Sequence, residues 1–335
     1  ITQSDLSDVD ALLVRSVTQV NQALLAGTTV KYVGTATAGC DHLDQKVLDA
    51  MGIPHQHAPG SNAQSVVEYV MSCLAVRQLN HSIAIGEGCV GIVGLGQVGS
   101  RLAKMLVALG YKVIAFDPLI EQGSYPWLST LEEVASADII CLHAPLTHEG
   151  LHPSVGLIDK NFIEAMKPGA TFISAGRGGV VDEQALMAAN QNEKITFLAM
   201  DVWLNEPAIS AEVLSVADIA TPHIAGYSFD GKLKATQMLC DWLNEQWGSP
   251  LLMTEVAEQV DLEIDLAEVP TSDQISTAII TAYDVRNDDR AFRQDYLAFD
   301  SLRKNYPKRR EFSAYRVVNA AGEIIPKLRA LGFRL

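Results

Sequence analysis

The sequence predicts an α/β protein: two Rossmann-like, doubly wound parallel-sheet domains flanking a cleft, and a small C-terminal α+β domain. Short apolar runs alternate with helical patterns along most of the 335 residues, a glycine-rich turn follows one of these runs, and the composition changes after Pro250. Such alternation is typical of parallel sheets, because a helix makes each crossover between strands. The length suits two or three domains.

The first domain is predicted at residues 1–80 together with residues 232–253. Its strands are expected at Ala11–Val14 and Val30–Val33, and its helices at Asn21–Leu25, His42–Met51 and Ala63–Leu79. Gly27 and Gly52 stand where the first two helices are expected to end. A long helical pattern, Lys232–Trp247, is expected to return the chain to this domain.

The second domain is predicted at residues 81–231, where the alternation is most regular. Its strands are expected at Val90–Val93, Val113–Phe116, Ile139–Leu142, Thr171–Ser174, Ile195–Met200 and Ile219–Thr221, and its helices at Val98–Leu109, Leu131–Ala135, Lys160–Met166 and Asp182–Asn190. In a doubly wound sheet, ligands bind beyond the carboxyl ends of the strands. Residues 254–335, where acidic and then basic residues cluster, are predicted to form the third domain.

Composition excludes several classes of function. Asp and Glu number 40 against 25 Lys and Arg, a net charge of −15, whereas a nucleic-acid-binding protein needs a basic surface. Five cysteines without a C-x-x-C pair indicate reduced thiols in a cytoplasmic protein. No apolar run approaches the ~20 residues of a membrane span, and no signal peptide is visible. The histidines lack metal-ligand spacing, so no metal is expected.

The sharpest local feature is a G-x-G-x-x-G turn that follows the predicted strand Val90–Val93 and opens a helix. Gly94 permits the tight turn, Gly96 lets the backbone approach a pyrophosphate, and Gly99 lets the helix pack close to the strand. Asp117 ends the next strand, where its carboxylate can bind both ribose hydroxyls and repel a 2′-phosphate. This pattern favours NAD over NADP, although the turn alone would also suit FAD or another adenine nucleotide.

Three reactive residues, Arg177, Glu206 and His223, each follow a predicted strand. Because the carboxyl ends of parallel strands border one crevice, we expect them to converge near the nicotinamide. An imidazole suits a base that takes the hydroxyl proton of a 2-hydroxy acid. Glu206 would hold that ring and stabilise the imidazolium. Arg177 offers a planar fork for the substrate carboxylate and the developing oxyanion.

Taken singly, each of these residues has an ordinary interpretation. Arg177 between glycines suits a surface turn, Glu206 suits an exposed loop, and His223 suits a packed loop. All three in this order, behind a dinucleotide-binding turn, favour the catalytic interpretation.

Seven further segments point to a known family: Val14–Thr18, Gly34–Gly39, Ala58–Ala63, Val66–Tyr69, His223–Tyr227, Tyr283–Arg286 and Leu302–Tyr306. With them the chain resembles the D-2-hydroxyacid dehydrogenase family, and within it the members that carry a C-terminal unit. The resemblance implies Arg177 and Glu206 as catalytic residues, His223 as the acid/base, and a phosphorylated 2-hydroxy acid as substrate. It also implies a homodimer formed by the C-terminal domain, and a strand and a helix preceding Ile1.

The resemblance implies a set of ligand contacts as well. Besides the turn glycines, the implied NAD contacts are Gln97, Val98, Asp117, Ala175, Gly176, Arg177, Asp201 and Gly226. The implied substrate contacts are Ser16, Thr37 and Tyr227. Ser16 and Thr37 equally suit turn hydroxyls that bond to local backbone, and Tyr227 equally suits simple packing.

A substrate phosphate needs a cation, and the sequence offers two candidates. Arg15 lies beside Ser16, and the run Lys308-Arg309-Arg310 is isolated in a strongly acidic chain. This run either reaches the active site of the partner subunit or forms a solvated charged face.

Three positions depart from the family pattern. Gly176 stands where Cys is usual, Leu204-Asn205 where Glu-Gly is usual, and Ala144 where a Thr that contacts NAD is usual. None of these changes removes a reacting group. Two other functions stay open: another D-2-hydroxyacid dehydrogenase, of the phosphoglycerate or glyoxylate type, and an NAD-sensing regulator without enzymatic activity. The acidic charge and the C-terminal unit argue against the regulator.

Overall fold

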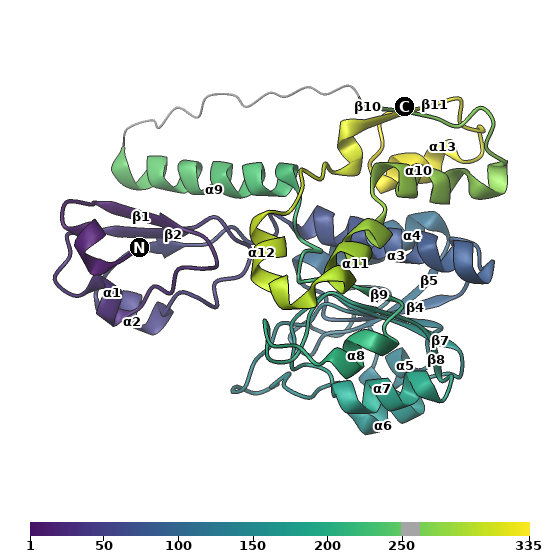
Figure 1. The fold of residues 1–335 in the computed structure, drawn as a ribbon, viewed down its shortest axis with the longest axis horizontal. Helices are drawn as coiled ribbons and strands as arrows, with labels where there is room; N and C mark the ends of the chain where they lie inside the picture. The colour runs from purple at the N-terminus through teal and green to yellow at the C-terminus, as the bar shows by residue number, and fades with distance from the viewer. Residues whose placement is uncertain (249–261) are drawn as a thin grey trace. The chain divides into compact units, whose positions relative to one another are not determined.

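The computed structural model describes residues 1–248 and 262–335, and its contacts divide them into two compact units (Figure 1). Residues 1–63 and 228–248 make up the first unit, and residues 64–227 and 262–335 the second. Each strand pair in both units is parallel, so the predicted α/β class is confirmed.

The first unit contains a three-stranded sheet in the order β1-β2-β3. Its elements are η1 (Gln3–Leu6), β1 (Ala11–Val14), α1 (Gln22–Leu25), β2 (Tyr32–Thr35), α2 (Gln45–Ala50), β3 (His55–Gln56) and α9 (Phe229–Trp247). Helix α9 packs on β2, where Trp242 and Trp247 set their rings edge-on to Tyr32. A Cβ on Gly34 would lie 3.4 Å from Leu239 of this helix, so the glycine permits the close approach.

The second unit is built on a six-stranded sheet in the order β5-β4-β6-β7-β8-β9. These strands are β4 (Cys89–Val93), β5 (Lys112–Phe116), β6 (Ile139–Leu142), β7 (Ala170–Ser174), β8 (Ile195–Met200) and β9 (Ile219–Ala220). Strand order reverses at β4, which pairs with β5 on one side and β6 on the other. Crossovers therefore leave β4 and β6 in opposite directions, and the carboxyl end of the sheet is open to a ligand there.

Helices cover both faces of this sheet (Figure 1). One face carries α3 (Ala63–His81) and α4 (Gln97–Leu109), and the other α5 (Leu131–Ala135), α6 (Lys160–Ala165), α7 (Glu183–Gln191) and α8 (Ala211–Val216). Asp182 caps α7 by accepting hydrogen bonds from the amides of Gln184 and Ala185. Helix α8 and strand β3 were not predicted from the sequence.

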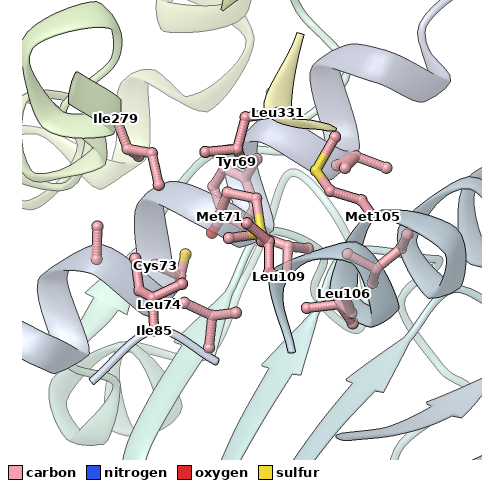
Figure 2. Packing of buried hydrophobic residues seen from close by; sticks show 14 of the residues in the cluster. Tyr69, Met71, Cys73, Leu74, Ile85, Met105, Leu106, Leu109, Ile279 and Leu331 are labelled. Atoms are coloured by element: carbon pink, nitrogen blue, oxygen red, sulfur yellow. The ribbon is translucent and has the colours of Figure 1, made fainter. Parts of the chain in front are cut away.

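The C-terminal residues 262–335 pack on the rest of the second unit. Their elements are β10 (Leu262–Asp265), η2 (Thr271–Asp273), α10 (Gln274–Ala282), α11 (Val285–Gln294), η3 (Tyr296–Ala298), α12 (Phe299–Lys304), η4 (Phe312–Ala314), β11 (Tyr315–Val318) and α13 (Ile325–Leu331). In Figure 2, Tyr69 and Met71 of α3 lie in one apolar cluster with Leu106 of α4 and with Ile279 and Leu331 of the C-terminal residues. Helix α3 is buried on nearly all sides because it packs against two layers.

This packing divides the chain differently from the predicted domains. Residues 64–80, which the sequence assigns to the first domain, group with the second unit, because α3 shares the core of the six-stranded sheet. Residues 262–335 join the same unit. The predicted boundary between residues 253 and 254 lies outside the described residues.

Candidate active site

The glycine turn, residues 94–99, connects β4 to α4 with little room on its inner side. Gly94 has φ +92°, and a Cβ on it would lie 2.8 Å from the Ala144 nitrogen. A Cβ on Gly99 would lie 1.9 Å from the carbonyl oxygen of Gly94, so the helix contacts the turn itself. Gly96 caps α4 and has no atom within 4 Å of its Cβ position. The open side is therefore at the N-terminus of α4, where free N–H groups face outward.

Asp117 lies at this turn, directly after β5. Its Oδ2 accepts a hydrogen bond of 2.8 Å from the Leu95 amide, and its Oδ1 accepts one of 3.0 Å from the Leu119 amide. Gln97 and Val98 form the first residues of α4. A carboxylate beside an open helix N-terminus fits the ribose and pyrophosphate of a dinucleotide. The described residues therefore fit NAD.

Glu206 and His223 form a direct pair. Nδ1 of His223 lies 2.7 Å from Oε2 of Glu206, and Oε1 accepts a bond of 2.9 Å from the Trp203 amide. Burial raises the pKa of Glu206, but the hydrogen bond and charge of His223 outweigh it and hold the pKa below its ordinary value. Glu206 is therefore a carboxylate near neutrality. Because it occupies Nδ1, Nε2 is left for a substrate hydroxyl.

The His223 turn, residues 223–227, is held by Asp201 at the end of β8. His223 has φ +56°, a left-handed conformation that few residues other than glycine adopt. Asp201 is 1% exposed, and its carboxylate accepts hydrogen bonds from the Thr221 hydroxyl and from the amides of Ile224 and Ala225. Burial raises the pKa of Asp201, against three hydrogen bonds that favour its ionised form. Its expected NAD contact stays a prediction.

The Arg177 loop packs against the loop that carries Glu206. A Cβ on Gly178 would lie 1.8 Å from the Trp203 carbonyl oxygen, so only glycine permits this contact. The half-buried Arg177 donates through Nη1 to the Gly176 carbonyl at 2.9 Å. All three predicted catalytic residues therefore follow neighbouring strands, with the second and third bonded and the first on an adjoining loop.

Two departures from the family pattern have a structural explanation. A Cβ on Gly176 would lie 2.7 Å from the Ala144 carbonyl oxygen, so this backbone leaves no room for a cysteine. Asn205 has φ +62°, the conformation in which a glycine is ordinary and an asparagine is tolerated.

Tyr227 meets residues from the C-terminal part of the chain that the sequence analysis missed. Its ring packs edge-on to Tyr306 at 5.7 Å, and the Arg303 guanidinium lies 5.7 Å from its centroid. The charge of Arg303 also helps to lower the pKa of Glu206. Leu302–Tyr306 carries part of the family resemblance, and that was the available signal for these contacts.

Neither interpretation of the run Lys308-Arg309-Arg310 holds for Arg309. Its side chain is 4% exposed, and it donates hydrogen bonds to the carbonyls of Ser65 and Ala225 of its own chain. It is therefore not part of a solvated face, and it does not reach a partner's active site. A run of basic residues in the sequence does not show that one of them is buried against backbone carbonyls of its own chain.

His143, directly after β6, is a further residue that the sequence analysis missed. Neither ring nitrogen makes a hydrogen bond of normal geometry among the described residues, and both are buried. Burial lowers the pKa of His143 to about 4, against a smaller effect of the Ala175 backbone. Its ring is therefore neutral near pH 7, beside the Gly94 turn that its backbone contacts.

The remaining predicted contacts lie in the first unit. Arg15 and Ser16 are exposed after β1. Thr37 bonds to local groups, the Thr35 hydroxyl at 2.8 Å and the Gly39 carbonyl at 2.6 Å. Burial, and next the charge of Arg15, lower the pKa of Lys232 in the first turn of α9. The substrate contacts of these residues stay predictions.

Comparison with known proteins identifies the family. Erythronate-4-phosphate dehydrogenase of Teredinibacter turnerae is 41% identical over 344 residues, covering 100% of this chain and 91% of that protein. The protein of the same name from Pseudomonas aeruginosa is 40% identical over 363 residues, covering 100% and 92%. The chain belongs to the erythronate-4-phosphate dehydrogenase family.

Domain and structure comparisons agree with this family. Residues 71–225 match the D-isomer specific 2-hydroxyacid dehydrogenase NAD-binding domain, and residues 256–332 match a domain of unknown function, DUF3410. D-lactate dehydrogenase from Aquifex aeolicus, solved with NAD and lactic acid, aligns with TM-score 0.61 and 25% identity over 74% of this chain and 86% of its own. The chain is an NAD-dependent oxidoreductase of the erythronate-4-phosphate dehydrogenase family.

Within residues 1–248 and 262–335, no three His, Cys, Asp or Glu side chains are grouped so as to hold a metal ion. No helix in the described part of the chain has the length and apolar character that crossing a membrane requires.

The contact at Gly178 gives a prediction. A Gly178→Ala substitution must push the Arg177 loop away from the Trp203 carbonyl, and a displacement of about 1 Å at a catalytic group can cost on the order of 10²-fold in rate. We expect kcat/KM with NAD and a 2-hydroxy acid to fall by about that factor. Gly322→Ala, which has open space around the new Cβ, is the control and should retain full activity. Equal activities of the two variants would contradict the packing argument.

Proposed function

We propose that this chain oxidises 4-phospho-D-erythronate to 2-oxo-3-hydroxy-4-phosphobutanoate, a step in pyridoxine and pyridoxal 5′-phosphate biosynthesis. The bond between Nδ1 of His223 and Oε2 of Glu206, at the carboxyl end of a sheet that binds NAD, carries the proposal. The relatives' shared name supports the substrate. NAD, when bound at the glycine turn, supplies the acceptor for the hydride that leaves C2.

In the proposed mechanism, Nε2 of His223 takes the proton of the C2 hydroxyl. The resulting imidazolium faces the Glu206 carboxylate, which is held ionised and is 20% exposed. Because the pair is partly shielded from water, the attraction between them is stronger than at a surface. Glu206 also keeps the proton on Nδ1, which leaves Nε2 able to act as the base.

Arg177 is the proposed partner of the substrate carboxylate. A guanidinium donates two parallel hydrogen bonds to a carboxylate, and it also stabilises negative charge on the C2 oxygen. Tyr227 is the proposed contact of the substrate in the same unit, and Ser16 and Thr37 are those of the first unit. The proposed NAD contacts are Gly94, Gly96, Gln97, Val98, Gly99, Asp117, Ala175, Gly176, Arg177, Asp201 and Gly226.

Arg15 is the proposed partner of the substrate phosphate, together with Lys232. The charge of Arg15 contributes to the lowered pKa of Lys232, so the two cations lie near enough to repel each other. A phosphate dianion between them would replace that repulsion with two attractions. Lys232 also lies in the first turn of α9, where the helix favours an anion.

We propose a homodimer formed by the C-terminal domain. Strand β10 pairs with β11 on one edge, and its other edge has no partner among the described residues. Two strands alone are marginally stable, and an open edge invites pairing with a second copy. We also propose the cytoplasm as the compartment, because it would keep the five cysteine thiols reduced.

The first prediction concerns turnover. Purified protein should form NADH from 4-phospho-D-erythronate, followed at 340 nm, and His223→Ala should lower kcat by roughly 10²–10⁴-fold through loss of the base. The exposed His152 is a matched control, and His152→Ala should keep wild-type activity. Preference for an unphosphorylated 2-hydroxy acid would favour another dehydrogenase of this family. Regulation of assembly by NADH, without turnover of any hydroxy acid, would favour a regulator.

The second prediction concerns the phosphate. Arg15→Met and Lys232→Met should each raise KM for 4-phospho-D-erythronate by roughly 10- to 100-fold, the usual effect of losing one charged hydrogen bond. Neither change should alter the much weaker reaction with D-erythronate, which has no phosphate. Lys31→Met, at an exposed ion pair with Asp10 in the same unit, should leave both reactions unchanged. A similar loss with both substrates would refute the phosphate assignment.

The third prediction concerns assembly. Sedimentation equilibrium should give twice the chain's 36.2 kDa, independently of NAD. A monomer in this measurement would contradict the proposed homodimer.

A further inference from the structure

Arg309 belongs to the domain of unknown function, yet its guanidinium is buried beneath the His223 turn. One nitrogen, Nη1, donates to the Ala225 carbonyl at 3.2 Å, and Nη2 donates to the Ser65 carbonyl at 2.5 Å. Its plane lies against the Tyr283 ring, 3.6 Å from the centroid. A charged side chain at 4% exposure is costly to bury, so these contacts have to be specific.

Asp201 binds backbone amides of the His223 turn, whereas Arg309 binds a backbone carbonyl of the same turn. The amides of Ile224 and Ala225 donate to the Asp201 carboxylate, and the carbonyl of Ala225 accepts from Arg309. Ala225 is two residues from His223, whose left-handed backbone is unfavourable for a histidine and needs support from its neighbours. The turn is thereby held from both sides.

Arg309 is itself fixed by surrounding groups. Glu68, fully buried on α3, lies 4.0 Å from Nη2 and accepts hydrogen bonds from Gln64 and from the Phe312 amide. On the other side, Asp288 accepts hydrogen bonds from the hydroxyls of Tyr283 and Tyr306, at 2.7 and 2.8 Å. The Glu68 carboxyl group and the Tyr283 ring therefore flank the guanidinium, one from α3 and the other from the C-terminal residues, and Asp288 fixes the Tyr283 hydroxyl.

We propose that Arg309 is a positioning residue for His223, and that the C-terminal domain completes the active site of its own chain through it. The effect on catalysis rests on the proposed function, whereas the effect on the turn does not. A planar fork is required, because the two acceptors lie on different elements and a single ammonium group cannot reach both in the same geometry.

The alternative is that Arg309 only neutralises buried Glu68 and supports the fold. Lysine separates the two roles, since Arg309→Lys keeps the positive charge but loses the fork. Arg309→Met removes both. Arg316→Met is the matched control, because Arg316 is in the same domain but forms an exposed ion pair with Glu263.

The experiment measures four quantities on the full-length wild type and the three variants: Tm, the Kd for NAD, kcat with 4-phospho-D-erythronate, and amide hydrogen exchange in the peptide covering residues 221–227. We expect Arg309→Lys to keep Tm and the Kd for NAD, to lose roughly 10-fold or more in kcat, and to exchange faster at Ile224 and Ala225. Arg309→Met should show a larger loss of kcat, on the order of 10²-fold. Arg316→Met should match the wild type in all four.

Wild-type kcat and wild-type exchange in Arg309→Lys would overturn the proposal, because charge alone would then suffice. If Arg309→Met does not fold, the lysine variant decides the question by itself. If the wild type turns over no hydroxy acid, the proposed function fails, and the exchange measurement still decides whether Arg309 holds the turn.

Discussion

The buried Asp201 carboxylate is the constraint on which the catalytic geometry depends. It collects two amides and a hydroxyl from residues 221–225 and so determines the path of the backbone that carries His223. The 2.7 Å bond to Glu206 can form only if that path is kept. A carboxylate with several hydrogen bonds in a dry site gains more from each than it would in water, which offsets part of the cost of its burial.

Close contacts between backbone segments fix the loops around the site. Where Gly178 meets Trp203 and Gly176 meets Ala144, the loops approach so closely that no side chain fits. Loops that follow neighbouring strands are therefore packed like the interior of a core. This arrangement is suited to a reaction in which the base, the carboxylate partner and the cofactor must share one geometry.

The C-terminal residues also support the His223 turn. Arg303 and Tyr306 approach Tyr227, and Arg309 reaches Ala225, so the domain of unknown function contacts the His223 turn at successive points. The same residues enclose α3 (Figure 2). One polar network and one apolar core thus connect this domain to the NAD-binding sheet.

The sequence alone determined the α/β class, the strands of the NAD-binding sheet and the glycine turn, because local periodicity and spacing encode these features, and it singled out the three residues that we propose as catalytic. Only the tertiary structure decided that α3 belongs with the second unit, that Asp201 holds the His223 turn, and that Arg309 is buried rather than exposed. Each of these depends on groups more than 20 residues apart in the chain meeting in a dry interior. The sequence shows which side chains are charged, but only the folded chain shows which backbone carbonyls they bind.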